Sequence, residues 1–557
     1  MNTNLQQYII TIIDSIKSRP NFDLSLHSKS QLLFDVINIS AARLEGGHLW
    51  TLLVSEVILF GGVIYLLVFL GLSYNVLDHK KLFLSLVKRA KSISYFGLAG
   101  VVFSIINMFK MSNIDWFKGL SILNASYKID IFTQSSKLCA LLIVLFLFAF
   151  LSLAINNNFN SAVIELPILL NIAISLSFIM ISCGNFALLL LALEGFSLIL
   201  YILTTVERAY GGITAAVKYF AFGTLGSVFL FWGVVHLYAI VPSLSYKVIF
   251  FLTDFSSTFK FLEGYDYNAI EFATTAITMG FLIKLGAAPL HQWVPDVYAG
   301  SHVFITALFA TFVKFILFVL FIRIAYFTNN GIFVDFAILI SLFLGCYMTL
   351  KQTEIKRFLA YSSIVHVSFL LMGDFSASFT YLATYMLSSL LIFSVLMSVR
   401  INGKELIYLN DLRFIRQSGL QNTILVIVSL ASAAGLPPFA GFYGKFAVWV
   451  SLFEDVYLFN NIVSYVILLS SIILSLAIIF YYMRIIAYLF ISDDSQLSVN
   501  FLFSSAQPVV MFAEAERIYL VQIVYSVLLI FWTALHSSFL NFVELISFSI
   551  VTAWQVV

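Results

Sequence analysis

The sequence predicts an all-α, polytopic membrane protein with about fourteen transmembrane helices. Of its 557 residues, 61% are hydrophobic and 10% are charged. Soluble domains are about half apolar and about a quarter charged, so this chain cannot cover a water-facing surface with polar groups. Apolar runs long enough to cross a bilayer, which takes roughly 20 residues, recur along the chain. We expect helices because unpaired backbone groups in hydrocarbon are strongly unfavourable.

The apolar runs define both the helices and the organisation of the chain. In order, they lie at about 51–74, 94–110, 131–155, 163–183, 185–205, 215–240, 268–290, 302–326, 331–350, 357–373, 377–399, 421–452, 461–487 and 519–540. The expected units are a polar extension at 1–47, three transmembrane helices in 48–160, a repeat in 161–328, a second repeat in 329–490, and a loop with the last helix in 491–557.

The segments between these runs alternate in the sign of their charge. After the first, ninth and eleventh runs the charged residues include Lys80, Lys81, Lys88, Arg89, Lys91, Lys351, Lys356, Arg357, Arg400, Lys404, Arg413 and Arg416. After the sixth and twelfth runs they include Asp254, Glu263, Asp266, Glu271, Glu454 and Asp455. Because inside loops carry an excess of Lys and Arg, the odd-numbered loops are predicted to face inside and both termini outside.

Proline interrupts two of the runs. Pro289 lies in the seventh run, and Pro437 and Pro438 lie in the twelfth. The two runs are five spans apart, and a repeat of five helices must invert across the membrane because five is odd. Paired broken helices in inverted repeats mark the transport site in many transporters. Proline is also common in membrane helices generally, so the spacing carries the prediction of two inverted five-helix repeats.

Several ionisable residues lie inside the apolar runs, where each costs roughly 2.5–3.5 kcal/mol at the bilayer centre. A buried lysine beside a carboxylate can exchange protons near neutral pH, because burial and the carboxylate act on its pKa in opposite directions. Lys218 also fits a helix-end lysine whose amine reaches the headgroups, and His366 also fits a hydrogen bond within the bundle. His236 is assigned to that second role. The candidates for a proton relay are Glu194, Lys218, Lys284, Lys314, His366 and Lys445.

Other chemistries find no support in the sequence. Cys139, Cys183 and Cys346 are scattered through apolar stretches without a CxxC pair or a Cys/His cluster, so we expect no metal or iron–sulfur site. No GxGxxG motif opens a helix after a strand, and no Ser/His/Asp set is evident. A net charge of +2 argues against the basic surface that binding to nucleic acid requires. Any redox centre that this protein serves is therefore expected on other chains.

Six stretches carry a family resemblance: YKIDIFTQSSKL, ALEGFSLILYIL, AAVKYFAFGTLGS, GFLIKLGAAPLHQWVPDVYAGS, TEIKRFLAYSSIVH and AGLPPFAGFYGKF, between about residues 126 and 450. In these the chain resembles the long form of the subunit 2 family of respiratory complex I, NADH:ubiquinone oxidoreductase. Subunits 4 and 5 and the multisubunit antiporters usually read PxAH after the His-x-Trp, and subunit 4 typically has glutamate at the position of Lys445. Where the family usually has a small residue and proline after PDVYxG, this chain has Ser301 and His302.

The resemblance implies an antiporter-like subunit of the complex I membrane arm, with proton transfer coupled to quinone reduction elsewhere in the complex. It implies that Glu194 tunes Lys284, that Lys314 and His366 continue the relay, and that Lys445 serves a second half-channel. It also implies flavin and iron–sulfur clusters on partner subunits, other antiporter-like subunits as neighbours, and no cofactor on this chain.

The 58 Phe residues point to an A+T-rich genome such as that of many organelles. With the resemblance, they predict the mitochondrial inner membrane, with both termini on the intermembrane-space side. The alternatives are a subunit of a cation/proton antiporter and a structural scaffold. The scaffold gives no reason for the buried lysines.

Overall fold

The computed structural model describes residues 53–74, 79–110, 120–122, 126–154, 164–206, 210–240, 243–246, 249, 267–325, 331–401, 405–459, 462–490, 510–512, 516–530, 539 and 543–544. Within them, ten helices are long and apolar enough to cross a membrane. The expected polar extension at 1–47 and most of the segment between 491 and 515 lie outside the described residues.

The helices follow the predicted apolar runs in order. The first part of the chain forms α4 (Val54–Ser73), α5 (His79–Lys110), α6 (Ile131–Ala154), α7 (Leu166–Ser182), α8 (Phe186–Thr204) and α9 (Tyr210–Ile240). The next part forms α11 (Tyr267–Leu285), α12 (Trp293–Gly300), α13 (Val303–Leu308), the π-helix η2 (Phe309–Val313) and α14 (Lys314–Ala325). The last part forms α15 (Gly331–Lys351), α16 (Ile355–Met372), α17 (Phe375–Ser398), α18 (Arg413–Ser418), α19 (Leu420–Ala434), α20 (Ala440–Phe459), α21 (Ile462–Phe490) and α23 (Glu516–Ile530).

Two of the predicted boundaries are wrong. The basic residues from Lys80 to Lys91 were assigned to a loop, but they form the first turns of α5, which begins 15 residues before the predicted start at about 94. Glu454 and Asp455 were also assigned to a loop and lie in α20. In both places the charged side chains extend a helix, because long side chains can carry their charge away from the apolar surface.

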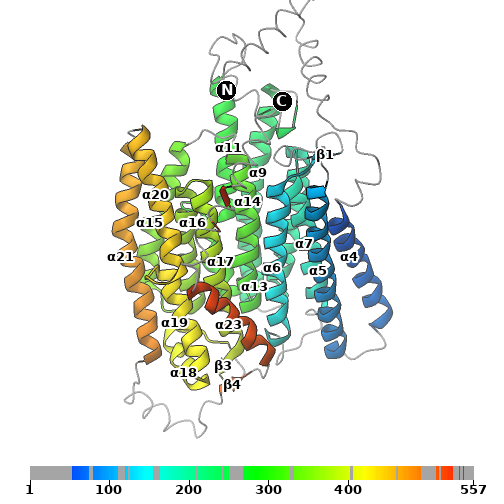
Figure 1. Cartoon of the computed structure of the whole chain (residues 1–557), viewed down its shortest axis with the longest axis vertical. Coiled ribbons are helices and arrows are strands. Elements are labelled where there is room, and N and C mark those ends of the chain that lie inside the picture. The colour runs from blue at the N-terminus through cyan, green and yellow to red at the C-terminus, as the bar shows by residue number, and fades with distance from the viewer. Residues whose placement is uncertain are drawn as a thin grey trace, which may run out of the picture.

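Short strands and a 3-10 turn complete the described elements. β1 (Leu120–Ile122) pairs with β2 (Tyr127–Ile129), and β3 (Val399–Ile401) pairs with β4 (Val510–Phe512), both antiparallel. The 3-10 turn η3 (Leu409–Leu412) leads into α18. β1 lies at the end of the bundle drawn at the top of Figure 1, whereas β3, β4 and α18 lie at the opposite end.

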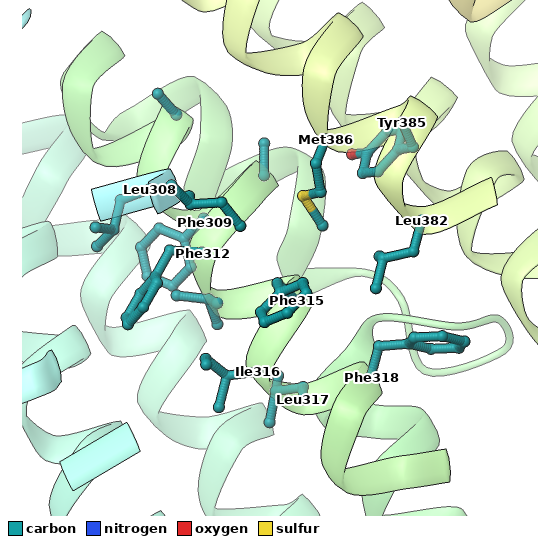
Figure 2. Packing of buried hydrophobic residues seen from close by; sticks show 14 of the residues in the cluster. Leu308, Phe309, Phe312, Phe315, Ile316, Leu317, Phe318, Leu382, Tyr385 and Met386 are labelled. Atoms are coloured by element: carbon teal, nitrogen blue, oxygen red, sulfur yellow. The ribbon is translucent and has the colours of Figure 1, made fainter. Parts of the chain in front are cut away.

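The long helices stand side by side and roughly parallel, as Figure 1 shows. α4 and α5 lie at one edge, and α15, α20 and α21 lie at the other. The most enclosed elements are between them: in an 18-residue stretch of Val303–Ala325, 94% of the residues are buried, and in one of α17 the share is 89%. In Figure 2, Phe315 and Phe318 of α14 lie toward Leu382 and Met386 of α17. Lipid is as apolar as these side chains, so close packing and dispersion hold this centre together.

The order of elements agrees with two similar halves. The first contains α7, α8, α9, the interrupted pair α11–α12, and α13–α14. The second contains α15, α16, α17, the interrupted pair α19–α20, and α21. The broken helix is thus the fourth element in each half, as the proline spacing predicts. The inverted relation of the two halves and the domain boundaries stay predictions.

Candidate functional site

The first broken helix places Lys284 beside Glu194. Lys284 lies in the last turn of α11, two residues before Gly286, whose φ of 78° ends the helix. Glu194 lies in the middle of α8, which Asn185 caps by accepting a hydrogen bond from the Leu188 amide at 2.8 Å. Lys284 Nζ is 3.6 Å from Glu194 Oε1. The structure therefore brings together the lysine and the carboxylate that the resemblance links.

The two members of this pair differ in exposure. The side chain of Lys284 is 7% exposed, and that of Glu194 is 42% exposed at the edge of the bundle. Neither Lys284 Nζ nor Glu194 Oε1 has a hydrogen-bond partner among the residues that the structure describes. The pair is close enough for strong electrostatic coupling, because at about 4 Å two charges in a partly buried site interact by roughly 4 kcal/mol before desolvation is counted.

The two helix breaks have the same local structure. Gly286 and Gly435 have φ of 78° and 80°, the left-handed conformation that suits glycine at the end of a helix. The amides after them bond five residues back, Ala287 to Leu282 O at 2.9 Å and Leu436 to Ala431 O at 3.1 Å. Pro289, Pro437 and Pro438 lie in the short non-helical links, with cis bonds at Ala288–Pro289 and Pro437–Pro438.

At each break a side chain donates to a carbonyl group near the end of the helix. The Trp293 indole donates to Ile283 O at 2.9 Å, and Lys445 Nζ donates to Ala434 O at 2.7 Å. Lys445 lies in α20 with 2% of its surface exposed. A helix C-terminus carries partial negative charge, so the end of α19 is a favourable place for this ammonium group.

Lys314 lies at the centre of the bundle, where η2 passes into α14. It is 5% exposed, and its Nζ donates to Ser363 O of α16 at 3.1 Å. Its Nζ also lies 5.8 Å from the centre of the Tyr385 ring. Single π-turns are rare and often occur at functional sites.

His366 connects these cations through tyrosines. Its Nδ1 lies 2.6 Å from Tyr381 Oη and its Nε2 lies 2.9 Å from Tyr482 Oη. Its ring centre is 4.8 Å from that of Tyr385, the ring that Lys314 also faces. His366, Tyr385 and Lys445 line one small internal cavity of about 10 Å³. Lys314 and His366 thus share Tyr385 as a neighbour, and His366 and Lys445 share this cavity.

Lys218 lies apart from this path. Its Nζ is 2.5 Å from Asp296 Oδ2, and the two side chains are 54% and 37% exposed. They line an open cavity of about 500 Å³, which we call the charged cavity, at the end of the bundle. Its other charged lining residues are Glu354, Lys356, Arg357 and Glu405. The structure thus places Lys218 in an exposed ion pair of this cavity, and both of its predicted roles stay predictions.

The unusual residues Ser301 and His302 lie at this same end. Ser301 ends α12 and His302 caps α13, accepting the Phe304 amide on Nδ1 at 3.1 Å. His302 Nε2 then lies 3.1 Å from Glu405 Oε1. Lys356 Nζ lies 2.5 Å from Glu405 Oε2 and donates to Ser301 O at 2.8 Å. Glu405 therefore ties the start of α13 to α16.

Two further clusters of buried charges lie in the N-terminal helices and near the opposite end. Lys137 of α6 pairs with Glu56 of α4, which also accepts hydrogen bonds from Tyr127 Oη at 2.6 Å and Ser55 Oγ at 2.7 Å. Asp130 lies 3.5 Å from Lys128 and 4.0 Å from Arg323 of α14. Burial alone would raise the pKa of Asp130, but the Lys128 and Arg323 cations hold it below its ordinary value.

The sequence contained a signal for these missed residues. Glu56, Lys137 and Arg323 lie inside the predicted runs 51–74, 131–155 and 302–326, so the criterion applied to Lys284 would have selected them too. Their partners Lys128 and Asp130 lie just outside a run and carry no such signal. Among the described residues, no group of three or more His, Cys, Asp and Glu side chains is placed to hold a metal ion. The lack of a cofactor on this chain stays a prediction.

Comparisons with known proteins agree with the fold and the motifs. Residues 183–475 match the family described as NADH:quinone oxidoreductase/Mrp antiporter, transmembrane. The chain is 30% identical over 347 residues to NADH-quinone oxidoreductase subunit N of Jannaschia sp. (strain CCS1), covering 60% of this chain and 68% of that protein. It is 29% identical over 397 residues to the subunit N of Neisseria gonorrhoeae, covering 68% and 79%.

A solved structure shows the same fold. A chain of respiratory complex I from Thermus thermophilus with bound aureothin superposes with a TM-score of 0.67 at 24% identity. The superposition covers 87% of this chain and 98% of that one. At this identity the likeness supports the polytopic helical architecture.

Proposed function

The chain belongs to the NADH:quinone oxidoreductase/Mrp antiporter transmembrane family, and from this membership we propose that it moves protons through a buried path that contains Lys284. It is an antiporter-like membrane-arm subunit of complex I, the proton-translocating NADH:quinone oxidoreductase, and it works in a complex with other subunits. We expect the flavin and iron–sulfur clusters on partner subunits.

The observation that carries the proposal is the pair of Lys284 and Glu194 at the first broken helix. A lysine 7% exposed and 3.6 Å from a carboxylate can change its charge when the carboxylate moves or gains a proton. At the broken end of α11, backbone N–H and C=O groups leave the regular helical hydrogen-bond pattern, and neighbouring protein groups must bond to them. Such interrupted helices are typical of transport sites. The Lys284 side chain can thus take up a proton and release it again.

The rest of the path is proposed from the polar groups that follow one another across the bundle. Lys314 hydrogen-bonds to the α16 backbone, faces Tyr385, and through this ring is linked to His366. His366 and Lys445 line the same internal cavity. We therefore assign Lys284, Lys314, His366 and Lys445 to the relay, with Glu194 controlling its first member. Lys218 is proposed only as a residue of the charged cavity.

A finer identity is also proposed. The motifs resemble subunit 2 in its long form, and the Phe-rich composition fits an organelle genome. We propose the mitochondrial inner membrane, with both termini in the intermembrane space, whereas the relatives named above are bacterial. Protease protection of tagged termini in sealed mitochondria and inside-out vesicles tests this orientation, since a matrix-exposed tag contradicts it.

A second candidate function is exchange of a cation for a proton without NADH, because the matched family also includes Mrp antiporters. Reconstitution of the purified chain in liposomes distinguishes the two candidate functions. Sodium- or potassium-driven proton movement that requires Lys284 would favour the antiporter. Proton movement that requires the assembled complex, NADH and quinone supports the proposed function.

The central experiment replaces Lys284 by Met in the assembled complex. An apolar side chain there removes a desolvation cost, so the complex should assemble while proton translocation falls. NADH oxidation and membrane-potential formation in sealed vesicles measure the effect, with Glu194→Gln as the companion variant. Wild-type turnover and proton yield in both variants would refute the role of this pair.

A further inference from the structure

A small cavity lies beside Lys284, between residues of α8, α9 and the end of α11. It has a volume of about 20 Å³. One water molecule needs roughly 10–15 Å³ of such space, so the cavity accommodates about one. Among its lining residues are Ser197, Tyr201, Gly223, Lys284 and Trp293.

The polar groups at this cavity need a hydrogen-bond partner. Tyr201 is 8% exposed and Lys284 is 8% exposed. Neither Tyr201 Oη nor Lys284 Nζ has a hydrogen-bond partner in the part of the chain that the structure describes. Leaving a buried polar group unsatisfied is strongly unfavourable. The cavity is lined mainly by apolar side chains, but it has room for one water molecule that would satisfy both polar groups.

The sequence of α8 directs Tyr201 toward the cavity. Glu194, Ser197 and Tyr201 are spaced at i, i+3 and i+7, so they share one face of the helix. Long side chains on a helix lean toward its N-terminus, which brings the Tyr201 hydroxyl back along α8 toward Ser197. The Tyr201 ring is fixed by edge contacts to Tyr219 and Phe220, with centres 4.8 and 5.4 Å away.

Two glycines of α9 leave the space that this arrangement needs. A Cβ at Gly223 would collide with Tyr201 Oη, and one at Gly226 would lie 3.2 Å from Lys284 Cγ. The glycines lie one turn apart, so α9 presents a notch to both side chains. The hydroxyl of Tyr201 occupies room that only glycine provides.

From these contacts we propose that the cavity binds a single water molecule, held by Lys284 Nζ, Tyr201 Oη and Ser197 Oγ. We further propose that Tyr201 is a positioning residue for proton transfer at Lys284. The water accepts a hydrogen bond from the Lys284 ammonium group and remains linked to the Tyr201 hydroxyl. Neither the water nor Tyr201 gains or loses a net proton. Lys284 then has two polar partners, Glu194 and the water, and can turn between them.

This inference rests on the proposed function and adds the residue that gives Lys284 its second partner. The first test is a map of the intact complex at a resolution that shows ordered water. We expect one water within hydrogen-bond distance of Lys284 Nζ and Tyr201 Oη, and its loss in Tyr201→Phe. An apolar, empty cavity in the wild-type map would overturn the proposal.

The second test is kinetic, in sealed vesicles carrying the intact complex. Tyr201→Phe keeps the ring contacts and should slow proton translocation roughly fivefold, the effect expected for one hydrogen bond. It should also raise the solvent deuterium isotope effect, which a purely structural residue would leave unchanged. Gly223→Ala should reproduce both changes by displacing the hydroxyl. Gly61→Ala, where no atom lies within 4 Å, and Tyr525→Phe serve as controls.

The outcomes separate this inference from the proposed function. If Lys284→Met abolishes translocation but Tyr201→Phe keeps wild-type rate, isotope effect and ordered water, the inference fails and the proposed function stands. If Lys284→Met itself leaves translocation unchanged, the role of Lys284 fails, and the role given to Tyr201 fails with it. Loss of the water together with slower, isotope-sensitive translocation supports the inference.

Discussion

At the scale of single residues, the three buried lysines of the proposed relay have different partners. Lys284 faces the Glu194 carboxylate at 3.6 Å, whereas Lys314 and Lys445 donate to the backbone carbonyls of Ser363 and Ala434. In the part of the chain that the structure describes, Lys284 alone of the three pairs with a carboxylate. A carboxylate can change charge and a carbonyl cannot. Lys284 is therefore the residue at which an ionisable neighbour can switch the relay.

The replacement Lys284→Arg tests whether proton release matters at this position. Guanidinium keeps the positive charge near Glu194 but does not release its proton in proteins. Assembly should be preserved and proton translocation should fall on the order of tenfold or more, because a proton relay needs both charge states. Membrane-potential formation per NADH oxidised measures the change. Lys88→Arg, in the basic first part of α5, is the matched control, and equal proton yield in both variants would contradict the assignment.

The sequence indicates candidate relay residues that lie alone in apolar runs, but it does not show which charged residues pair with one another. Glu194, Lys284 and Lys314 stand out because each interrupts a long apolar stretch. Glu56 and Lys137 come together only when their two helices, α4 and α6, are placed by the tertiary fold, which no periodicity specifies. The position of Lys218 was open for the same reason, since Asp296 is 78 residues away in the chain.

At the scale of elements, the broken helices combine glycine, proline and a polar donor in the same way. Gly286 and Gly435 end their helices in the left-handed region, and prolines follow within three residues. Proline spacing alone predicted the two breaks, because a helix cannot continue through a residue without an amide proton. The side chains that donate to carbonyl groups at the breaks, Trp293 and Lys445, are placed there by tertiary packing and were not predictable.

Gly435→Ala is expected to damage the second break. Alanine at a φ of 80° costs about 1–2 kcal/mol, and its Cβ would lie 2.8 Å from Lys445 Cδ. The substitution should displace the Lys445 ammonium from Ala434 O, lowering proton translocation more than complex yield. Yield on native gels and translocation in vesicles measure the two effects. Gly71→Ala, where no atom lies within 4 Å, is the control, and an unchanged rate in Gly435→Ala would contradict this role.

Glu405 lines the charged cavity and joins several elements around it. Its carboxylate holds Lys356 and His302 and also accepts the Val303 amide at 3.2 Å, so one side chain joins α13, α16 and the loop. Burial alone would raise the pKa of Glu405, but Lys356, His302 and the Val303 amide hold it below its ordinary value. A lowered pKa means that the ionised carboxylate stabilises the fold above its unfolded pKa. That stability is lost as the pH falls through the folded value.

Glu405→Gln should therefore destabilise the complex at neutral pH by roughly 1–2 kcal/mol, between the values for exposed and buried ion pairs. The difference from wild type should persist down to the ordinary glutamate pKa of 4.5 and shrink in more acidic solution. Thermal unfolding across this pH range, read out on the purified complex, measures it. Glu354→Gln is the control, because Glu354 forms a more exposed ion pair with Arg357. The Arg357 side chain is 46% exposed and the Glu354 side chain is 33% exposed. A destabilisation that grows with acid would contradict the assignment.

At the scale of the whole molecule, composition and apolar run length predicted the architecture well. Every predicted run contains a helix or an interrupted pair of helices, because hydrocarbon leaves the backbone little choice. The predicted start of α5 is too late for a physical reason. Arg89 lies 3.9 Å above the Phe69 ring, so a charged residue packs along the helix and does not end it. Which helices enclose the centre, such as α13–α14 and α17, depends on packing and could not be predicted.

One face of the molecule requires a neighbour. The Glu194 side chain is 42% exposed in the middle of α8, where a charge facing lipid would cost roughly 2.5–3.5 kcal/mol. Leu191 and Leu198, at i−3 and i+4, lie on the same face and are 73% and 54% exposed. Because the subunit works within a complex, we expect another membrane-arm subunit to cover this face and to place a polar group near Glu194.

A photo-crosslinking amino acid at Leu198 tests this prediction in the intact complex. Irradiation should link the chain to one membrane-arm subunit, identified by mass spectrometry of the linked peptide, because a covered carboxylate needs protein and not lipid beside it. The same probe at Leu72 of α4, which is 75% exposed on another helix, should give a different product. Lipid adducts alone at Leu198 would mean that Glu194 faces the bilayer. That result would contradict the predicted neighbour at this face.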